Sequence, residues 1–595
     1  MLLQDRAVGT TTVRRRRQAV VIESIAPIDR FPRSSLLACS AVVVVAGLVY
    51  LNSLHNPFVY DDVLSVVNNT SLTDPTLRSV LMQNVSRPLV NVSYVIEHAI
   101  WGPEPFGYHV TNVLVHMLNV ALLFMLARGI ALDRWRVNSA NGNRSATLAG
   151  AVAAMLFAVH PMMTGAVGYV SGRSDLLSGM FMLLSLVTLR RWLNTDRSIW
   201  LVVVLATFFL ALASKETAVI LPALFLYYVL LVRRDPVADR RRHVLMLCVP
   251  LMAIAVVGAG VRIGLFVFVE QAGIAGWQWR FALTEIDVFV RYLAMMVAPV
   301  GQTIFHGVTI TRSVLDPRAI VALCVVATYL TLVVIDARRR GIVAFGLIWF
   351  LLMLVPSALL ILLNRGEAMV ERRVYFASVG LFLAAGQGAA SVAALRGSVS
   401  RGTRVLVAAV ALVVIVGLAG RSVLRNYVWS SPVWLWAEAV DRNPGYWYPL
   451  LLLGNSLHDA GRHDEAIQAF QGALRFGANV AEVYEDLGRC QVQEKHLDEA
   501  VVTFTALWTI HPRSTAATNG RATAALLRGQ IDEARRGFME SLQFDPDNIP
   551  ARRGLVAVET QTGRLEDARR RCEEIAMREP GVTVAACLEH APKTH

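Results

Sequence analysis

The stretch LLACSAVVVVAGLVYL, residues Leu36–Leu51, decides the fold class, because it carries no charged residue and approaches the helix length that crosses a bilayer. The basic run RRRR at Arg14–Arg17 precedes it. The apolar run begins too far from the N-terminus for a cleaved signal peptide, and many more hydrophobic segments follow. We therefore predict a first transmembrane helix after a cytoplasmic basic segment, residues 1–35.

The composition agrees with a membrane protein. Of the 595 residues 55% are hydrophobic, and the mean hydropathy is +0.49. Both values are typical of an integral membrane protein. The net charge of +13 could indicate a nucleic-acid partner. Since the basic residues, nearly all arginine, fall in short clusters between apolar runs, membrane orientation explains them better, and no nucleic acid is predicted.

Further apolar runs predict an all-α, polytopic domain over residues 36–428 with about eleven transmembrane helices. After the first run they fall near 109–130, 147–167, 176–194, 199–214, 217–232, 244–266, 318–336, 341–363, 375–395 and 404–424. The run at 286–304 would break the alternation of sides. We predict that it is interfacial or re-entrant on the outer face.

Basic clusters orient this domain. They follow every second helix, at Arg134, Arg136 and Arg144, at Arg190 and Arg191, at Arg233, Arg234 and Arg240–Arg242, at Arg338–Arg340, and at Arg396, Arg401 and Arg404. By the positive-inside rule they share the side of the N-terminus. The loop 52–108 and the C-terminal tail are then extracytoplasmic. The expected location is a bacterial inner membrane, with the tail periplasmic, or the endoplasmic reticulum membrane with the tail lumenal.

A repeat of 34 residues fills the polar tail. The acidic-alanine pairs Glu465-Ala466, Glu499-Ala500, Glu533-Ala534 and Asp567-Ala568 keep this step, as do Phe470, Phe504 and Phe538. The period is that of tetratricopeptide (TPR) repeats, each a helix–turn–helix. We predict an α-solenoid over 433–582, followed by a tail, 583–595. Such an array offers a concave surface for an acceptor or partner protein.

Polar residues gather on the predicted outer face, in loops that apolar runs separate. The acids Asp61 and Asp62 follow the first helix. The other candidates are Arg87, His160, Arg173, Asp175, Lys215, Glu216, Glu371, Arg372 and Arg373. A carboxylate can take a proton from an attacking hydroxyl, and Arg or Lys can hold a leaving phosphate. The convergence predicts an active site for a phosphate-bearing lipid, with Asp61 or Asp62 catalytic and the others binding substrate.

Plain structural explanations compete with this one. The two aspartates could be a solvated loop or a helix N-cap, and Arg173 with Asp175 a local salt bridge. Lys215 could be a snorkelling lysine in an interfacial turn. His160 precedes Pro161, which is typical of a kink or a buried hydrogen bond. His109, Asn112 and His116 share a helix face, where we expect polar packing and no metal.

The cysteines give no metal site by their spacing. Six are scattered along the chain, and none has zinc-ligand spacing. An extracytoplasmic tail would allow a disulfide between Cys572 and Cys587, but their spacing alone does not establish it. A divalent ion at the aspartate pair is left open, and no cofactor is certain.

Six motifs, taken in order, resemble a known family. They are HNPFVYDD, RPLVNVSY, FGYHVTNVLVHMLN, FAVHPMMTGAVGYVSGRSDLLS, ASKETAVILPALFLYY and ERRVYFASVG. Together with the repeats they look like the transmembrane and TPR-repeat-containing O-mannosyltransferases and their bacterial relatives. The resemblance covers most of residues 36–580. It implies a C-type glycosyltransferase fold whose first extracytoplasmic loop carries the catalytic acid.

The resemblance also implies the substrates. Such enzymes take a sugar, here most simply mannose, from a polyprenyl- or dolichyl-phosphate carrier to Ser or Thr hydroxyls of extracytoplasmic proteins. Asp61 or Asp62 matches the acidic motif, Arg173 and Asp175 the GR-D motif, and Lys215 and Glu216 the SKE motif. The ERRVYF text departs from the family, so either Arg372 or Arg373 could hold the phosphate. The short tail departs too, which leaves the acceptor open.

The sequence leaves three alternatives open. A transferase of the same fold could act on lipid or polysaccharide acceptors. A non-enzymatic scaffold could use the repeats to recruit partners, in which case both aspartates would be dispensable. A transporter would require inverted repeats and polar residues near mid-bilayer, and neither is evident in the sequence.

Overall fold

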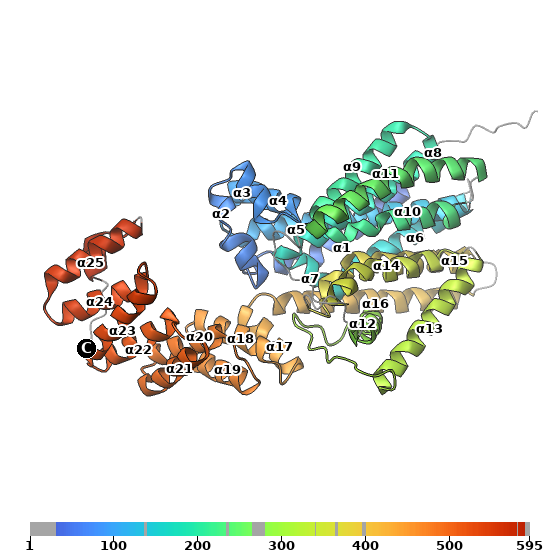
Figure 1. The fold of residues 1–595 in the computed structure, drawn as a ribbon. Helices are drawn as coiled ribbons and strands as arrows, with labels where there is room; N and C mark the ends of the chain where they lie inside the picture. The colour runs from blue at the N-terminus through green and yellow to red at the C-terminus, as the bar shows by residue number, and fades with distance from the viewer. Residues whose placement is uncertain are drawn as a thin grey trace, which may run out of the picture.

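The computed structural model describes residues 31–135, 140–233, 237–264, 280–339, 341–362, 367–394, 400–579 and 581–589. Every regular element in these ranges is a helix, as the sequence predicts. A bundle of long helices occupies one part of the molecule and a chain of short helix pairs the other (Figure 1). The all-α class with a C-terminal repeat array is confirmed.

The bundle contains a helix at each of the predicted apolar runs. Its long members are α1 (Arg33–Val49), α5 (Pro105–Trp135), α6 (Ala140–Val159), α8 (Arg173–Thr195), α9 (Ser198–Ser214), α11 (Val237–Gly264), α13 (Pro317–Arg338), α14 (Val343–Leu362), α15 (Val374–Ala394) and α16 (Arg401–Val428). The 217–232 run forms η5 (Glu216–Ile220), α10 (Leu221–Tyr227) and η6 (Tyr228–Val232).

These helices make the chain an integral membrane protein. Among the described residues, 7 helices are long and apolar enough to span a bilayer, or 8 if α6 and the segment after it, bent by 61°, form one span. Three shorter apolar helices lie at 198–214, 216–232 and 343–359. The predicted segments are thus all helical, and the number that cross stays a prediction.

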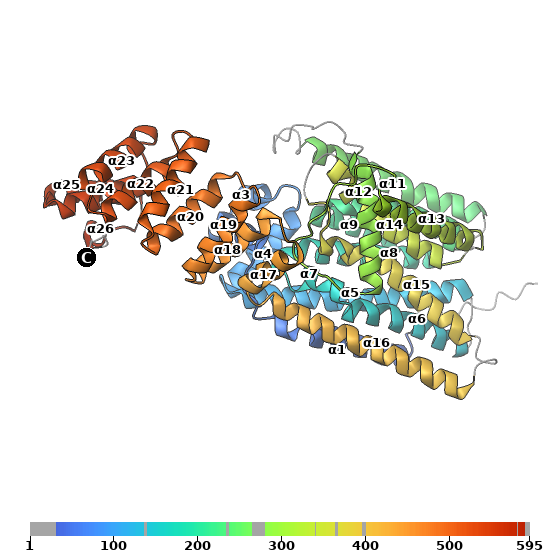
Figure 2. The same cartoon turned by 90° about the horizontal axis from the view of Figure 1, so that it is seen from below.

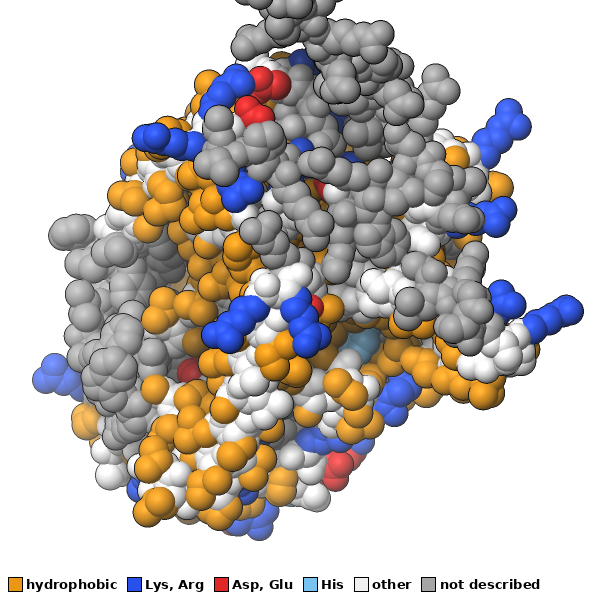
Figure 3. Space-filling view, turned by 90° about the vertical axis from the view of Figure 1, so that its right-hand side faces the viewer, with side chains coloured by type: hydrophobic (Ala, Val, Ile, Leu, Met, Phe, Trp, Pro, Cys, Tyr) orange, Lys and Arg blue, Asp and Glu red, His pale blue; other side chains and the backbone are white. Residues whose placement is uncertain are grey.

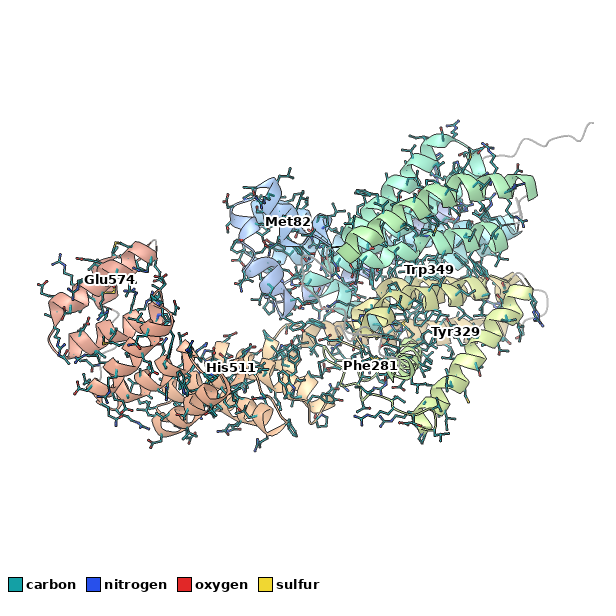
Figure 4. The ribbon with its side chains drawn as sticks, in the orientation of Figure 1. Met82, Phe281, Tyr329, Trp349, His511 and Glu574 are labelled. Carbon is teal, nitrogen blue, oxygen red and sulfur yellow. A yellow bond between two sulfur atoms is a disulfide. The ribbon has the colours of Figure 1, made fainter. Side chains whose placement is uncertain are left out.

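Small residues bring the bundle helices together. Gly346 on α14 faces Gly380 on α15, where an added Cβ would lie 2.2 Å from the Gly380 carbonyl oxygen. Close approach at small residues is typical of packing between membrane helices. Trp349, one turn along α14, is fully buried and donates its indole N–H to the Phe376 carbonyl at 3.0 Å (Figure 4).

The helix α12 (Arg280–Val297) covers most of the run that the sequence treats as interfacial. Figure 1 shows it end-on, whereas the bundle helices run across the view, and Figure 2 shows it crossing them. It is not among the helices that qualify as spans. A non-helical segment, 298–316, follows it and leads to α13. The interfacial or re-entrant role of this run stays a prediction.

The loop between α1 and α5 forms a small helical lobe. It contains η2 (Val63–Val67), α2 (Thr70–Thr73), α3 (Leu77–Gln83) and α4 (Pro88–Trp101). The lobe lies at the end of the bundle that faces the repeats (Figure 1), and Met82 marks its outer part in Figure 4. The predicted outer loop and the repeats therefore lie at the same end of the bundle.

The repeats begin at α17 (Pro432–Arg442) and continue as antiparallel pairs. They are α18 (Trp447–Asp459) with α19 (His463–Arg475), α20 (Ala481–Gln493) with α21 (Leu497–Ile510), α22 (Thr515–Leu527) with α23 (Ile531–Phe544), and α24 (Ile549–Gln561) with α25 (Leu565–Arg578). His511 and Glu574 mark successive parts of the array in Figure 4. The boundaries match the 34-residue step of the sequence.

Alanine and glycine allow the paired helices to pack. Ala466 and Ala500 are fully buried, at corresponding positions. A Cβ on Gly488 would lie 2.5 Å from the ring of Phe504 on the partner helix. Since real Cβ atoms do not approach so closely, the aromatic ring and the glycine specify each other.

The last pair carries a disulfide. Cys572 on α25 is bonded to Cys587 on α26 (Val584–Glu589), and their Cα atoms are 5.7 Å apart. The bond ties the terminal helix across the end of the array. It realises the pairing that the sequence left open.

Basic side chains rim the opposite end of the bundle. Figure 3 views the molecule from this end, and Lys and Arg side chains project around its edge. One arginine there is drawn inward: Arg190 pairs with Asp133 at 2.6 Å, and Tyr228 donates to the same carboxylate at 2.7 Å. Basic side chains therefore surround the end of the bundle that lies away from the lobe and the repeats.

Candidate active site

A strained turn separates the two aspartates. Tyr60 has φ of 52°, in the left-handed region that non-glycine residues rarely occupy. Strain of this kind often lies at functional sites. The turn sends the Tyr60 side chain toward the repeats, where its hydroxyl lies 3.0 Å from that of Tyr448 and its ring packs on Trp436. Asp61 and Asp62 then point to different surroundings.

Asp62 is fully buried and bound by protein groups. Its Oδ1 accepts from the Ser171 N–H at 2.7 Å and from the Ser171 hydroxyl at 2.6 Å. Its Oδ2 accepts from the Val59 N–H at 3.2 Å. Burial raises the pKa of the Asp62 carboxyl to about 7, against these hydrogen bonds, which favour the charged form. The side chain fixes the loop to the segment before α8.

Asp61 is the aspartate that a substrate can reach. Its side chain is 38% exposed, and its Oδ2 lies 3.3 Å from an Nη of Arg372. Its backbone N–H donates to the Tyr169 hydroxyl at 2.9 Å, and the Arg372 guanidinium lies over the ring of the same tyrosine. The pair of predicted catalytic residues is therefore not symmetric: one faces outward and one is structural.

A cavity of about 290 Å³ opens beside Asp61. Its charged lining groups are Asp61, Arg87 and Arg372, and Ser171 and Ser174 add hydroxyls. The lobe, the segment before α8 and the segment before α15 each contribute to the wall. One carboxylate and two guanidinium groups thus share one space, as the sequence predicts.

Arg87 is the N-cap residue of α4, and Glu216 holds its side chain. Its guanidinium makes a bidentate pair with Glu216, at 3.2 Å from Nε and 2.9 Å from Nη. The Ser174 hydroxyl lies 3.5 Å from its other Nη. Bidentate pairing fixes the plane of the guanidinium. Glu216 therefore orients Arg87 and does not line the cavity itself.

A buried ion pair lies next to this one. Lys215 Nζ donates to Asp175 Oδ1 at 2.6 Å, and both side chains are less than 10% exposed. The second Asp175 oxygen is buried and has no hydrogen-bond partner in the described part of the chain. Neither residue lines the cavity. The geometry makes them a support for its wall, where the sequence expected substrate ligands.

Arg173 lies in the core. It is fully buried and donates to Glu97 Oε1 at 2.7 Å, to the Tyr108 carbonyl at 2.8 Å, and to the Asn112 amide oxygen. Breaking such a buried pair is costly. The arrangement joins α4, α5 and α8, and Arg173 does not line the cavity. Its ion-pair partner is Glu97, whereas the alternative explanation from the sequence paired it with Asp175.

Three more candidates lie away from the cavity lining. His160 bonds the Met296 carbonyl at 3.1 Å and caps the bend after α6. Glu371 accepts from the Thr303 N–H at 2.6 Å and from His306 at 3.0 Å, and so anchors the 298–316 segment. Arg373 bonds the Ala368 carbonyl at 3.2 Å. Arg372 and not Arg373 thus reaches Asp61.

The helix face that imitates a metal site is a packing face. His109 bonds the Asn56 carbonyl at 3.1 Å, Asn112 the Tyr169 carbonyl at 2.9 Å, and His116 the Tyr375 hydroxyl at 2.9 Å. Their partners are different groups, so the three side chains do not converge. The expectation of polar packing agrees with this geometry.

Sequence reasoning missed the residues that connect the site to the repeats. Asn443 after α17 donates to the Phe305 carbonyl at 2.8 Å and accepts from the Gly307 N–H at 2.7 Å. Phe305 also packs against Tyr446 and Tyr448. The aromatic run GYWYP at 445–449 was the available signal. These contacts join the start of the repeats to the 298–316 segment.

Known proteins resemble the chain in both halves. Residues 457–524 and 525–586 match the tetratricopeptide repeat family model. The chain is 33% identical to Protein O-mannosyl-transferase Tmtc1 of Drosophila melanogaster over 31% of this chain and 21% of that protein. It is 25% identical to Protein O-mannosyl-transferase TMTC4 of Homo sapiens over 72% of this chain and 64% of that protein. These relatives confirm the resemblance to the O-mannosyltransferases.

The matched regions are only parts of the relatives. The chain spans about a fifth of the length of the first relatives it matches, and under two thirds of TMTC4. Among solved structures, ArnT from Cupriavidus metallidurans bound to undecaprenyl phosphate aligns with a TM-score of 0.34 at 16% identity, over 79% of this chain and 80% of that one. That score is too low to establish a shared fold.

Proposed function

We propose that the chain is a membrane glycosyltransferase that moves a sugar, most simply mannose, from a polyprenyl-phosphate carrier to Ser or Thr hydroxyls of an extracytoplasmic protein. The observation that carries the proposal is the cavity beside Asp61, whose lining includes one accessible carboxylate and two guanidinium groups. The relatives are named for this activity.

Asp61 is the proposed general base. In the proposed step its carboxylate takes the proton of the acceptor hydroxyl as the hydroxyl oxygen bonds to the anomeric carbon of the sugar. The bond between that carbon and the phosphate oxygen breaks, and the carrier leaves as the polyprenyl phosphate. A single displacement of this kind inverts the anomeric centre. Asp62 is excluded from the role because both of its oxygens accept hydrogen bonds from protein groups.

Arg372 and Arg87 are the proposed phosphate ligands. Both line the cavity, and Arg372 is the group already within 3.3 Å of Asp61. Guanidinium groups hold phosphate by paired hydrogen bonds and stabilise the charge that develops as the bond to the sugar breaks. Glu216 keeps Arg87 oriented, while the Lys215–Asp175 pair and Arg173 hold the wall behind it.

The repeats are proposed to lie outside the cytoplasm and to present the acceptor. The Cys572–Cys587 disulfide supports this side, because disulfides persist in oxidising compartments. The array starts beside the turn that carries Asp61, because Tyr448 contacts Tyr60, the residue before it. A polypeptide held along it would thus reach the site with its hydroxyl groups.

The experiment is transfer of labelled mannose from polyprenyl-phosphate mannose to secreted protein from the same cell, by the purified full chain in detergent. Label in protein supports the proposal, and Asp61→Asn should remove it. Asp74→Asn, an exposed acid of the same lobe, is the matched control and should transfer normally. Label that enters only lipid or polysaccharide would overturn the protein acceptor. No transfer with this or other lipid-linked sugars would overturn the enzyme.

A further inference from the structure

The first two repeats bring three metal-ligand side chains to one point. His458 lies in the last turn of α18, His463 opens α19, and Cys490 lies on α20. His458 Nδ1 is 3.2 Å from His463 Nδ1 and 3.3 Å from Cys490 Sγ. All three ligand atoms lie within 4.8 Å of one another, and no other group of this kind occurs within the described ranges.

Hydrogen bonding alone does not explain this convergence. The Nδ1 of a histidine has either one proton or one lone pair, so it serves one strong hydrogen bond at a time. Here two partners approach the same atom. A cation at the centre would instead take one lone pair from each group. On a tetrahedral zinc ion, two nitrogen ligands are about 3.3 Å apart and a nitrogen and a sulfur about 3.6 Å.

The neighbouring repeats show that the packing itself requires apolar residues here. One step along the array, the three positions hold Val492, Leu497 and Ala524, and one step further Leu526, Ile531 and Val558. Leu526, Ile531 and Val558 belong to a single apolar cluster. The first step alone replaces this contact with two imidazoles and a thiol. Repeat packing therefore does not account for the polar set.

The local backbone brings two of the ligands together. Gly461 has φ of 72°, which permits the tight turn that brings His463 back toward His458.

We propose that His458, His463 and Cys490 form a zinc site that ties α18 and α19 to α20. A thiolate with two imidazoles is a ligand set that zinc prefers over the oxygen-loving magnesium and calcium. Cys490 is buried, whereas His458 and His463 are half-buried. Solvent can therefore reach the ion, and water would take the fourth coordination position. The site is separate from sugar transfer, since it lies at the opposite end of α18 from Tyr448.

The site would stiffen the repeats nearest the membrane domain. The first turn of α18 contacts Tyr60 and Phe305, and its last turn carries His458. A metal ion bound at the last turn would therefore fix the orientation of the following repeats relative to the membrane domain. Zinc would also protect the Cys490 thiol in a compartment where Cys572 and Cys587 are oxidised.

Metal content and a cobalt spectrum test the proposal on the purified full chain. The protein is stripped with chelator, reloaded with Zn²⁺ in the presence of excess Mg²⁺, desalted and assayed for metal. We expect one equivalent of zinc per chain. Cobalt in place of zinc should give a thiolate charge-transfer band, and Cys490→Ser should abolish the band. A spectrum without that band, or no retained zinc, would overturn the proposal.

A variant that copies the neighbouring repeat separates folding from metal binding. His458→Leu with His463→Ile and Cys490→Val installs the apolar set of the third repeat, so the array should fold and lose the bound equivalent. Cys324→Ser and His496→Ala remove an exposed thiol and an exposed imidazole elsewhere and should keep it. Equal zinc in the triple variant and the wild type would contradict the site.

Discussion

At the scale of single residues, the adjacent acids Asp61 and Asp62 have opposite roles. The left-handed Tyr60 turns one toward the cavity and the other into the protein. Neighbours in sequence cannot be told apart by motif, because either could match it. The distinction depends on Ser171, which lies 109 residues away and donates two hydrogen bonds, from its N–H and its hydroxyl, to Asp62 Oδ1. The sequence therefore singled out the two acids but could not tell which of them lines the cavity.

The same limit applies to Arg173. Its motif predicted a substrate ligand, but its partners Glu97 and Tyr108 come from other helices and bury it. A charged residue in an apolar chain reads as functional by default. Here the charge joins three helices. Only the long-range contacts separate this role from a catalytic one.

Asp62 should make stability fall as the pH rises. Burial raises the pKa of its carboxyl from 3.8 to about 7 in the folded protein, so folding retains a proton that the unfolded chain has released. The contribution is full below about pH 4 and is lost as the pH rises through about 7, with an upper bound of about 4 kcal/mol.

Thermal unfolding of wild type and Asp62→Asn between pH 4 and 8, about the window these pKa values define, checks this expectation. The asparagine does not titrate, so the advantage of the wild type over the variant should shrink with increasing pH. Asp74→Asn, which removes an exposed acid, should run parallel to the wild type. A difference that grows with pH would contradict the assignment.

At the scale of elements, the sequence predicted most of the fold. Each apolar run became a helix because a chain in lipid must satisfy its backbone groups within the segment. The 34-residue step placed the repeat helices because alanine and phenylalanine recur where helices touch. The sequence did not predict the proposed zinc ligands. His458 and Cys490 are 32 residues apart, and the three side chains meet only after α18, α19 and α20 pack together.

Gly488 tests the helix packing. A side chain at Gly488 would strike the Phe504 ring, so Gly488→Leu should destabilise the repeats by about 1–3 kcal/mol. Hydrogen exchange of α20 and α21 should accelerate. Gly417→Ala, in the middle of α16 with no atom within 4 Å of its added Cβ, controls for removing a helical glycine. Unchanged exchange in Gly488→Leu would contradict the packing.

At the scale of the whole molecule, the parts proposed to act in sugar transfer lie at one end of the bundle. The lobe with Asp61, the cavity and the first repeat meet there, whereas Figure 3 shows basic side chains around the other end. By the positive-inside rule, basic residues favour the cytoplasmic side of a membrane. In the proposed orientation the shared end is therefore the extracytoplasmic one.

Labelling of engineered thiols in sealed, right-side-out vesicles tests this orientation. In a Cys324→Ser background, an impermeant maleimide should label Glu566→Cys, on the exposed surface of the repeats. Arg404→Cys, at the predicted cytoplasmic start of α16, should be labelled only after the membrane is opened. The reverse pattern would place the repeats in the cytoplasm and contradict the acceptor role.

The central claim is that Asp61, facing the cavity, is the base for sugar transfer. The most direct measurement compares the rate of transfer from polyprenyl-phosphate mannose by Asp61→Asn and Asp62→Asn, each normalised to folded protein. The account predicts a loss of about 10²- to 10⁴-fold in kcat for Asp61→Asn with donor binding retained, and a near-normal kcat for the folded fraction of Asp62→Asn. Near-normal turnover by Asp61→Asn, or loss only in Asp62→Asn, would contradict it.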